Sequence, residues 1–87
     1  MVDASKLTDN AFLRQYELTI DGEMATLEYS QQERKIFLTK LNIPENLMSD
    51  EFTEDFLKIV LENIVEKNIS VVPTSPPVAK FIRRNLR

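Results

Sequence analysis

The strongest periodic pattern in the chain lies between Ser49 and Lys67, where apolar residues recur at spacings of three and four. The series consists of Phe52, Phe56, Ile59, Val60 and Ile64, and it is widened by Leu57 and Leu61. This spacing predicts an amphipathic helix over residues 50–67 that packs on a core. Ser49 or Asp50 can cap its first turn, and Asn68 can end it in a left-handed conformation.

Before this helix, apolar and polar residues alternate with the period of two that is typical of strands. The alternation predicts three strands, over residues 12–20, 23–30 and 35–43. Asp21 and Gly22 lie between the first two, and an Asp-Gly pair is a strong hairpin signal. A polar turn over residues 31–34 is expected before the third strand. Pro44 ends that strand, because proline cannot donate a hydrogen bond to a neighbouring strand.

After the central helix, the pattern predicts a short buried strand over residues 69–72 and a last helix over residues 77–85. The order β-β-β-α-β-α predicts an α/β (α+β) fold. It consists of a three-stranded antiparallel meander plus one strand parallel to the third, with the helices packed on the sheet. Residues 1–11 show no period and are expected to form a flexible tail before a single domain over residues 12–87. The expected core contains Phe52, Phe56, Val60, Ile64, Leu38, Val71 and Phe81.

Composition restricts the chemistry open to the chain. It contains no cysteine and no histidine, which removes thiol nucleophiles, the commonest general base and the usual metal ligands. No metal site is therefore expected. The net charge of −3 argues against nucleic-acid binding, because neutralisation of phosphates dominates that affinity. No apolar run approaches the roughly 20 residues that span a bilayer, and no signal-peptide pattern opens the chain, so a monomeric cytoplasmic protein is expected.

A resemblance to a known family covers about residues 12–85. It rests on Ile43-Pro44, on the helix that follows, on the run from Val71 to Val78, and on the closing Phe81-Ile82-Arg83-Arg84-Asn85. These features resemble the small single-domain branch of the GNAT acetyltransferases, and the acidic-aromatic pair Glu28-Tyr29 fits the opening meander of that family. The resemblance implies the acetyl-CoA-binding half of the GNAT fold.

The resemblance also places the family's cofactor-binding turn at residues 48–53. An arginine of the family falls on Met48 and three glycines fall on Ser49, Glu51 and Thr53, with Asp50 and Phe52 between them. In the family these glycines let backbone amides approach the pyrophosphate of CoA at a helix N-terminus. Here side chains obstruct that approach and carboxylates repel the anion. A like-charge pair about 5 Å apart costs roughly 1 to 3 kcal/mol at effective dielectric constants of about 80 to 20.

Two further positions correspond to residues that the resemblance associates with catalysis. A cysteine of the family falls on Ser75 and a histidine falls on Lys40. Serine without a neighbouring base is a poor nucleophile, and Lys40 could act as a base only if burial lowered its pKa. The simpler interpretation makes Ser75 the cap of the last helix and Lys40 a solvated side chain.

Two function classes follow from these residues. The first is a GNAT-like protein that is degenerate in acetyl-CoA pyrophosphate binding and acts as a non-catalytic interaction module with an unidentified protein partner. The alternative is an active acetyl-CoA-dependent N-acetyltransferase that holds its cofactor through strand backbone and the basic last helix. That helix carries Lys80, Arg83, Arg84 and Arg87, which form either a solvated face or a patch for a CoA phosphate or an acidic partner.

Overall fold

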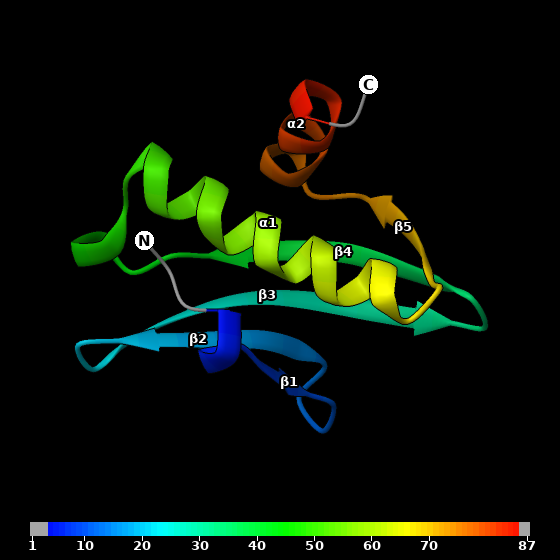
Figure 1. The fold of residues 1–87 in the computed structure, drawn as a ribbon, viewed down its shortest axis with the longest axis horizontal. Coiled ribbons are helices and arrows are strands. Elements are labelled where there is room, and N and C mark those ends of the chain that lie inside the picture. Colours follow the sequence, from blue (N-terminus) through cyan, green and yellow to red (C-terminus); the bar gives the residue numbers. More distant parts are fainter. Residues whose placement is uncertain (1–3, 86–87) are drawn as a thin grey trace.

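The structure, a computed structural model, describes residues 4–85 as a sheet with two α-helices (Figure 1). The strands are β1 (Thr8–Asn10), β2 (Gln15–Ile20), β3 (Glu23–Gln32), β4 (Lys35–Asn42) and β5 (Ser70–Pro73). The helices are α1 (Asp50–Glu66) and α2 (Pro76–Asn85), and there are two short 3-10 segments, η1 (Ala4–Lys6) and η2 (Glu45–Leu47). The predicted alternation of strands and helices from β2 to α2 is present in this order.

The sheet has the strand order β1-β2-β3-β4-β5. Strands β1 to β4 form an antiparallel meander, and β5 lies parallel to β4 on its other side. The parallel pairing of the last strand was predicted, and it follows because α1 carries the chain back along the sheet between β4 and β5. The meander has one more strand than predicted, since β1 precedes it.

The N-terminal region differs from the prediction of a tail over residues 1–11. Residues 8–10 form β1, which pairs with β2 from Thr8 opposite Glu17 to Asn10 opposite Gln15. Residues 1–3 of the expected tail lie outside the described residues. The predicted start of a strand at Phe12 is also wrong, because β2 begins at Gln15 and residues 11–14 form the turn that joins it to β1.

The turns of the meander use left-handed backbone conformations. Asp21 has φ 52° and Gly22 has φ 79°, so both central residues of the β2–β3 turn have the positive φ that a tight hairpin requires. Strand β3 continues to Gln32, so the polar turn expected over residues 31–34 is shorter than predicted and contains Glu33 at φ 54°. Asn68 ends α1 at φ 58°, as the sequence predicted.

The core lies between the sheet and the helices. Figure 1 shows α1 lying across one face of the sheet and α2 beside β5. Buried side chains of both helices belong to one cluster with those of the sheet, and Val78 is the contribution of α2. Of the predicted core residues, four are buried: Phe56, Val60, Ile64 and Leu38. The other three are only partly buried at the margin of the cluster: Phe52, Val71 and Phe81.

Candidate functional site

An opening in the sheet arises where β5 separates from β4. The carbonyl oxygen of Leu38 accepts hydrogen bonds from the Thr74 N–H (3.1 Å), the Ser75 N–H (3.0 Å) and the Thr74 hydroxyl (3.0 Å). Strand pairing between β4 and β5 ends at Leu38 opposite Pro73. Beyond this point β4 continues to Asn42 beside β3, whereas the chain after β5 leads into α2. The edge of β4 after Leu38 therefore has no strand partner among the described residues.

A β-bulge lies at the same place. Tyr29 of β3 pairs with Leu38, and the preceding residue Glu28 pairs with Lys40, so that Thr39 is the extra residue of β4. A bulge locally disrupts pairing and re-aims the side chains next to it. The bulge and the separation of the strands thus fall at the same place along β4.

The first turn of α1 follows the end of β4 along the chain, after η2. Ser49 is its N-cap: the Ser49 hydroxyl accepts a hydrogen bond from the Phe52 N–H at 3.0 Å, and its carbonyl accepts one from the Thr53 N–H at 3.0 Å. Asp50 and Glu51 place two carboxylates in the same turn. The cap satisfies an amide and the carboxylates complement the helix dipole. The chain itself thus supplies the interactions that an anion would make at this helix end.

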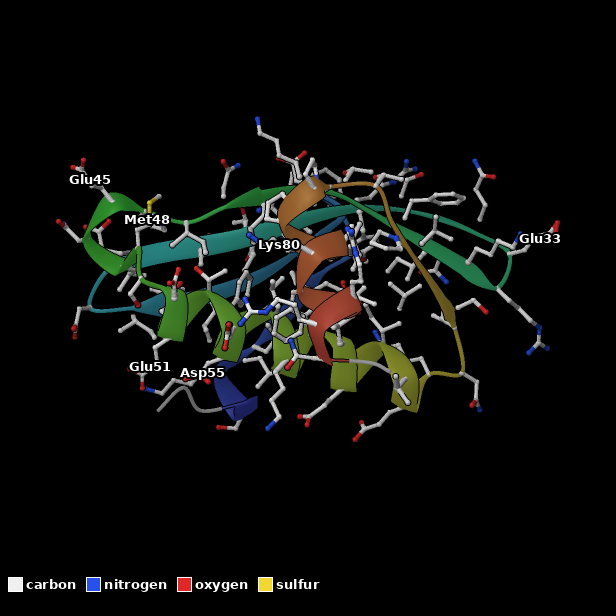
Figure 2. The ribbon with its side chains drawn as sticks, turned by 90° about the horizontal axis from the view of Figure 1, so that it is seen from above. Glu33, Glu45, Met48, Glu51, Asp55 and Lys80 are labelled. Atoms are coloured by element: carbon white, nitrogen blue, oxygen red, sulfur yellow. The ribbon has the colours of Figure 1, made fainter. Side chains whose placement is uncertain are left out.

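Carboxylates also flank both sides of the turn. Figure 2 shows Glu45 and Met48 near η2, with Glu51 and Asp55 on the first turns of α1. A cavity of about 400 Å³ on one side contains Glu51 and Asp55 in its lining, and a cavity of about 230 Å³ on the other contains Asp50 and Glu54. Met48, on which the sequence resemblance places the family's arginine, is 66% exposed and brings no charge to the turn.

Two basic residues of α2 lie close to this acidic turn. Lys80 and Arg84 line the cavity of about 230 Å³ together with Asp50 and Glu54. The Arg84 guanidinium lies 3.6 Å from the Glu54 carboxylate. Both partners are largely exposed, so the pair adds little stability, but it lowers the net positive charge that α2 offers to a phosphate. Arg87, the last member of the predicted basic set, lies outside the described residues.

Ser75 and Lys40 occupy different environments. Ser75 is 4% exposed and precedes α2, where its carbonyl accepts the first helical hydrogen bond from the Ala79 N–H at 2.9 Å. It therefore holds the N-cap position, in line with the simpler interpretation. Lys40 is exposed and pairs across the sheet with Glu28, which lies between the buried Leu27 and Tyr29. Successive residues of a strand face opposite sides, so Lys40 belongs to the face away from α1.

The structure therefore does not bring Ser75 and Lys40 into a catalytic pair. No hydrogen bond or ion pair between residues 4–85 joins them. The described residues also contain no cluster of three or more acidic side chains that could hold a metal ion. Within residues 4–85, no hydrogen bond links the Ser75 hydroxyl to a base that could activate it as a nucleophile.

A polar cluster that the sequence interpretation missed lies at the opposite end of α1. The Tyr29 hydroxyl donates to one carboxylate oxygen of Asp9 at 2.6 Å, and the Lys67 ammonium donates to the other at 2.8 Å. The Lys67 ammonium also lies 5.7 Å from the ring centre of Tyr16, whose hydroxyl donates to the Asn63 side-chain oxygen at 3.1 Å. The cluster ties β1 to β3 and to the end of α1.

The electrostatics of this cluster make it a structural clamp. Burial raises the pKa of Tyr16, and burial together with the hydrogen bond to Asp9 raises the pKa of Tyr29 well above its usual range. The hydrogen bond to Asp9 also raises the pKa of Lys67. At neutral pH the two phenols stay protonated and the amine stays charged, so none of them can serve as a general base. The paired partners lie 20 and 58 residues apart in sequence, which is why no local pattern indicated them.

Comparison with known proteins agrees with this architecture. The described residues contain no helix long and apolar enough to cross a membrane. A search of curated proteins found no match for the chain. The sequence model of the family described as GCN5-related N-acetyl-transferase matches residues 15–87, a range that runs from the first residue of β2 through α2. Because this match covers most of the 87 residues, the chain belongs to the GCN5-related N-acetyltransferase family.

Proposed function

We propose that this protein keeps the acetyltransferase fold but acts as a non-catalytic interaction module that binds another protein and does not hold acetyl-CoA in the family's usual mode. The observation that carries the proposal is the first turn of α1. Its Phe52 amide is already bonded to the Ser49 hydroxyl, and the carboxylates of Asp50 and Glu51 occupy the same turn. The pyrophosphate of CoA would have to displace the cap and approach these carboxylates.

The balance of free energies supports this proposal. Replacing a serine cap by other partners costs about 1 kcal/mol, and acids in the first turn add about 0.3 to 1 kcal/mol each to the helix. Each carboxylate within about 5 Å of a bound anion opposes it by roughly 1 to 3 kcal/mol, depending on the local dielectric constant. With carboxylates in both flanking cavities, the repulsions add up to more than one helix end can offset. The residues present therefore do not fit the pyrophosphate.

The positions of the two candidate catalytic residues, Lys40 and Ser75, also support a non-catalytic function. The transferase reaction requires a group that removes a proton from the acceptor amine or that activates a nucleophile. Lys40 lies on the sheet face away from α1, and Ser75 is buried at the start of α2. The two residues do not form a catalytic pair. We therefore propose that the protein functions by binding a partner through its surface.

The alternative function, an active N-acetyltransferase, is favoured by one observation. Among the described residues, the edge of β4 after Leu38 lacks a strand partner, and backbone groups at such an edge can bond an extended ligand such as the amide-containing arm of CoA. Lys80 and Arg84 line the cavity of about 230 Å³ between α1 and α2 and could contact a phosphate from α2. In that case binding would depend on α2 and β4 rather than on the turn.

An isothermal titration of acetyl-CoA into matched variants tests the proposal. The restored variant carries Met48→Arg, Ser49→Gly, Asp50→Arg, Glu51→Gly and Thr53→Gly, and it should bind the cofactor where the wild-type protein shows no saturable heat. A control variant with Glu62→Gly and Glu66→Gly removes two acids and weakens the same helix without altering the turn. It should behave like the wild type. Circular dichroism confirms that each variant is folded.

Two results would contradict the proposal. If the folded restored variant failed to bind acetyl-CoA, the turn would not be what prevents binding. If the control variant bound as well as the restored one, a general loss of negative charge rather than the turn would be responsible. Binding by the wild-type protein itself would favour the alternative function, and its loss in Arg84→Ala would then place the phosphate contact on α2.

A further inference from the structure

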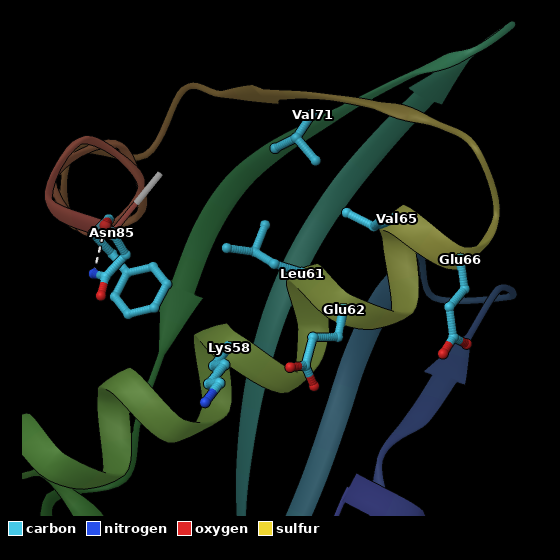
Figure 3. Close-up of a pocket in the computed structure, with 8 residues that line it drawn as sticks. Lys58, Leu61, Glu62, Val65, Glu66, Val71 and Asn85 are labelled. Carbon is cyan, nitrogen blue, oxygen red and sulfur yellow. Dashed lines mark hydrogen bonds between the residues drawn. The ribbon is translucent and has the colours of Figure 1, made fainter. Parts of the chain in front are cut away.

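An open apolar groove lies between the second half of α1, strand β5 and helix α2. Its volume is about 600 Å³, and its apolar lining consists of Leu61, Val65, Val71 and Phe81. In Figure 3, Leu61, Val65 and Val71 point toward one another, while Asn85 of α2 stands on the opposite side. Val65 is 66% exposed, a high value for a valine that faces neighbouring apolar side chains. The groove is therefore an apolar surface that residues 4–85 leave uncovered.

A second apolar feature projects from the other end of the chain, on the turn of residues 11–14. Phe12 is 93% exposed and Leu13 is 56% exposed. Such a pair at the tip of a turn adds nothing to the core of its own molecule. Exposure of large apolar side chains side by side marks interaction surfaces more often than single exposed residues do.

Hydrogen bonds hold this turn in place. The Leu13 N–H donates to the Asn10 side-chain oxygen at 3.0 Å, and the Asn10 amide donates to the Glu17 carboxylate at 2.9 Å. The carbonyl of Arg14, a residue at φ 57°, accepts a hydrogen bond from the Tyr29 N–H at 2.9 Å. A turn fixed in this way loses little conformational entropy on binding, which favours its use as an anchor.

The turn and the groove complement each other in charge as well as in polarity. Exposed Arg14 follows Phe12 and Leu13 directly. The groove carries exposed Glu62 and Glu66 in its lining, four residues apart on α1, with Lys58 toward the other end. The residues of α1 that line the groove span about 12 Å of helix, since each residue rises about 1.5 Å. This length suits two adjacent side chains better than a long helix.

We propose that a second copy of this chain occupies the groove with its 11–14 turn, placing Phe12 and Leu13 among the apolar side chains and Arg14 near Glu62 and Glu66. The contact joins two different surfaces, so each copy offers one turn and one groove. A single turn in a groove is smaller than a standard interface, and the association is therefore weak and concentration-dependent. The residues involved lie outside the 48–53 turn, so this inference stands apart from the question of cofactor binding.

Sedimentation velocity over about 10 µM to about 1 mM tests the association, because these concentrations bracket a weak contact. The sedimentation coefficient of the wild-type protein should rise across this range. Phe12→Ser and Val65→Lys should each weaken the association at least about tenfold, equivalent to about 1.4 kcal/mol. Met24→Ser is the matched control, since Met24 is 46% exposed but belongs to neither surface, and it should leave the association unchanged.

Mixing the two damaged variants distinguishes this contact from other kinds of self-association. Phe12→Ser retains an intact groove and Val65→Lys retains an intact turn, so their equimolar mixture should associate although each alone stays monomeric. Because the chain has no cysteine, Ala11→Cys gives a unique spin-label site. The labelled copy should broaden the amide signals of Leu61, Val65 and Val71 in an isotope-labelled partner copy.

Several results would overturn the proposal. A wild-type protein that stays monomeric to about 1 mM excludes a second copy as the occupant and leaves the groove to another protein. A mixture of Phe12→Ser and Val65→Lys that stays monomeric while the wild type associates excludes the turn-in-groove contact. Association lost equally in Met24→Ser, or broadening that avoids the groove, shows that another surface is responsible.

Discussion

Replacement of Phe56 by alanine should remove much of the stability of this fold. The Phe56 side chain is fully buried at 0% exposure, and its ring stacks on that of Phe52 at a centroid distance of 6.1 Å. Truncating a buried phenylalanine costs about 3 to 5 kcal/mol, because transfer free energy is lost and a cavity remains. A chain of 87 residues has a total stability of roughly 4 to 13 kcal/mol. The variant should therefore lose about a quarter or more of its stability, or fail to fold.

Urea denaturation followed by circular dichroism measures this loss, with Phe52→Ala as the matched control. Phe52 is only partly buried beside the core, so its truncation should cost less, about 1 to 2 kcal/mol. The two variants delete the same atoms from neighbouring turns of α1 and differ in burial. A loss under about 1 kcal/mol for Phe56→Ala, or a larger loss for Phe52→Ala, would show that the assigned core face of α1 is wrong.

Three further predictions concern the cap, the helix end and the polar cluster. Ser49→Ala should lower the free energy of unfolding by about 1 kcal/mol, whereas Ser49→Gly should cost only a few tenths; equal urea midpoints would argue against the cap. Asn68→Val should cost about 1 to 2 kcal/mol because Asn68 has φ 58°, while Asn68→Gly should be tolerated; equal effects would mean that α1 ends differently. Because folding raises the pKa of Tyr16, Tyr29 and Lys67, their stabilising contribution is present below about pH 10 and is lost as the pH rises through the folded-state values. Phenolate absorbance should therefore appear only as the protein unfolds, and titration of both phenols near their ordinary pKa in the folded protein would contradict the cluster.

The regular parts of the fold could be predicted because their signals are local. The helical spacing and the serine before it located α1, and Asp21-Gly22 located the hairpin that both positive φ values then confirmed. The β-branched run before Pro73 located β5, and the prolines after Ser75 located the start of α2. In each case one chemical feature of a few adjacent residues decides the backbone conformation.

The N-terminal part could not be predicted because its structure depends on distant partners. Strand β1 is a short polar edge strand, and Asp9 within it is held by Tyr29 and Lys67 from other elements. The alternation that begins at Phe12 indicated a strand. Arg14 instead takes a left-handed conformation, and the turn contains no glycine or asparagine that would have indicated it. The carbonyl of Arg14 then bonds Tyr29 of β3, a contact visible only in three dimensions.

The N-cap of α1 could be predicted from the sequence, but its surroundings could not. Ser49 caps α1 as one of two predicted possibilities, while the assignment of the family's cofactor turn to residues 48–53 stays a prediction. The direction of Lys40 depends on the bulge at Thr39, and the approach of Arg84 to Glu54 depends on the angle of α2. Neither the bulge nor the helix angle leaves a pattern in the sequence, and the groove between α1 and α2 is hidden for the same reason.

Amide chemical shifts of the wild-type protein during a titration with acetyl-CoA test the central claim most directly, because they report on each residue of the turn. Free CoA, added separately, controls for contacts made by the nucleotide part alone. The amides of residues 48–53 should keep their shifts up to about 1 mM cofactor, since the Ser49 cap and the carboxylates of Asp50 and Glu51 exclude the pyrophosphate. Saturable shifts at residues 48–53 with a micromolar dissociation constant would contradict the claim and show that the turn binds the cofactor despite its side chains.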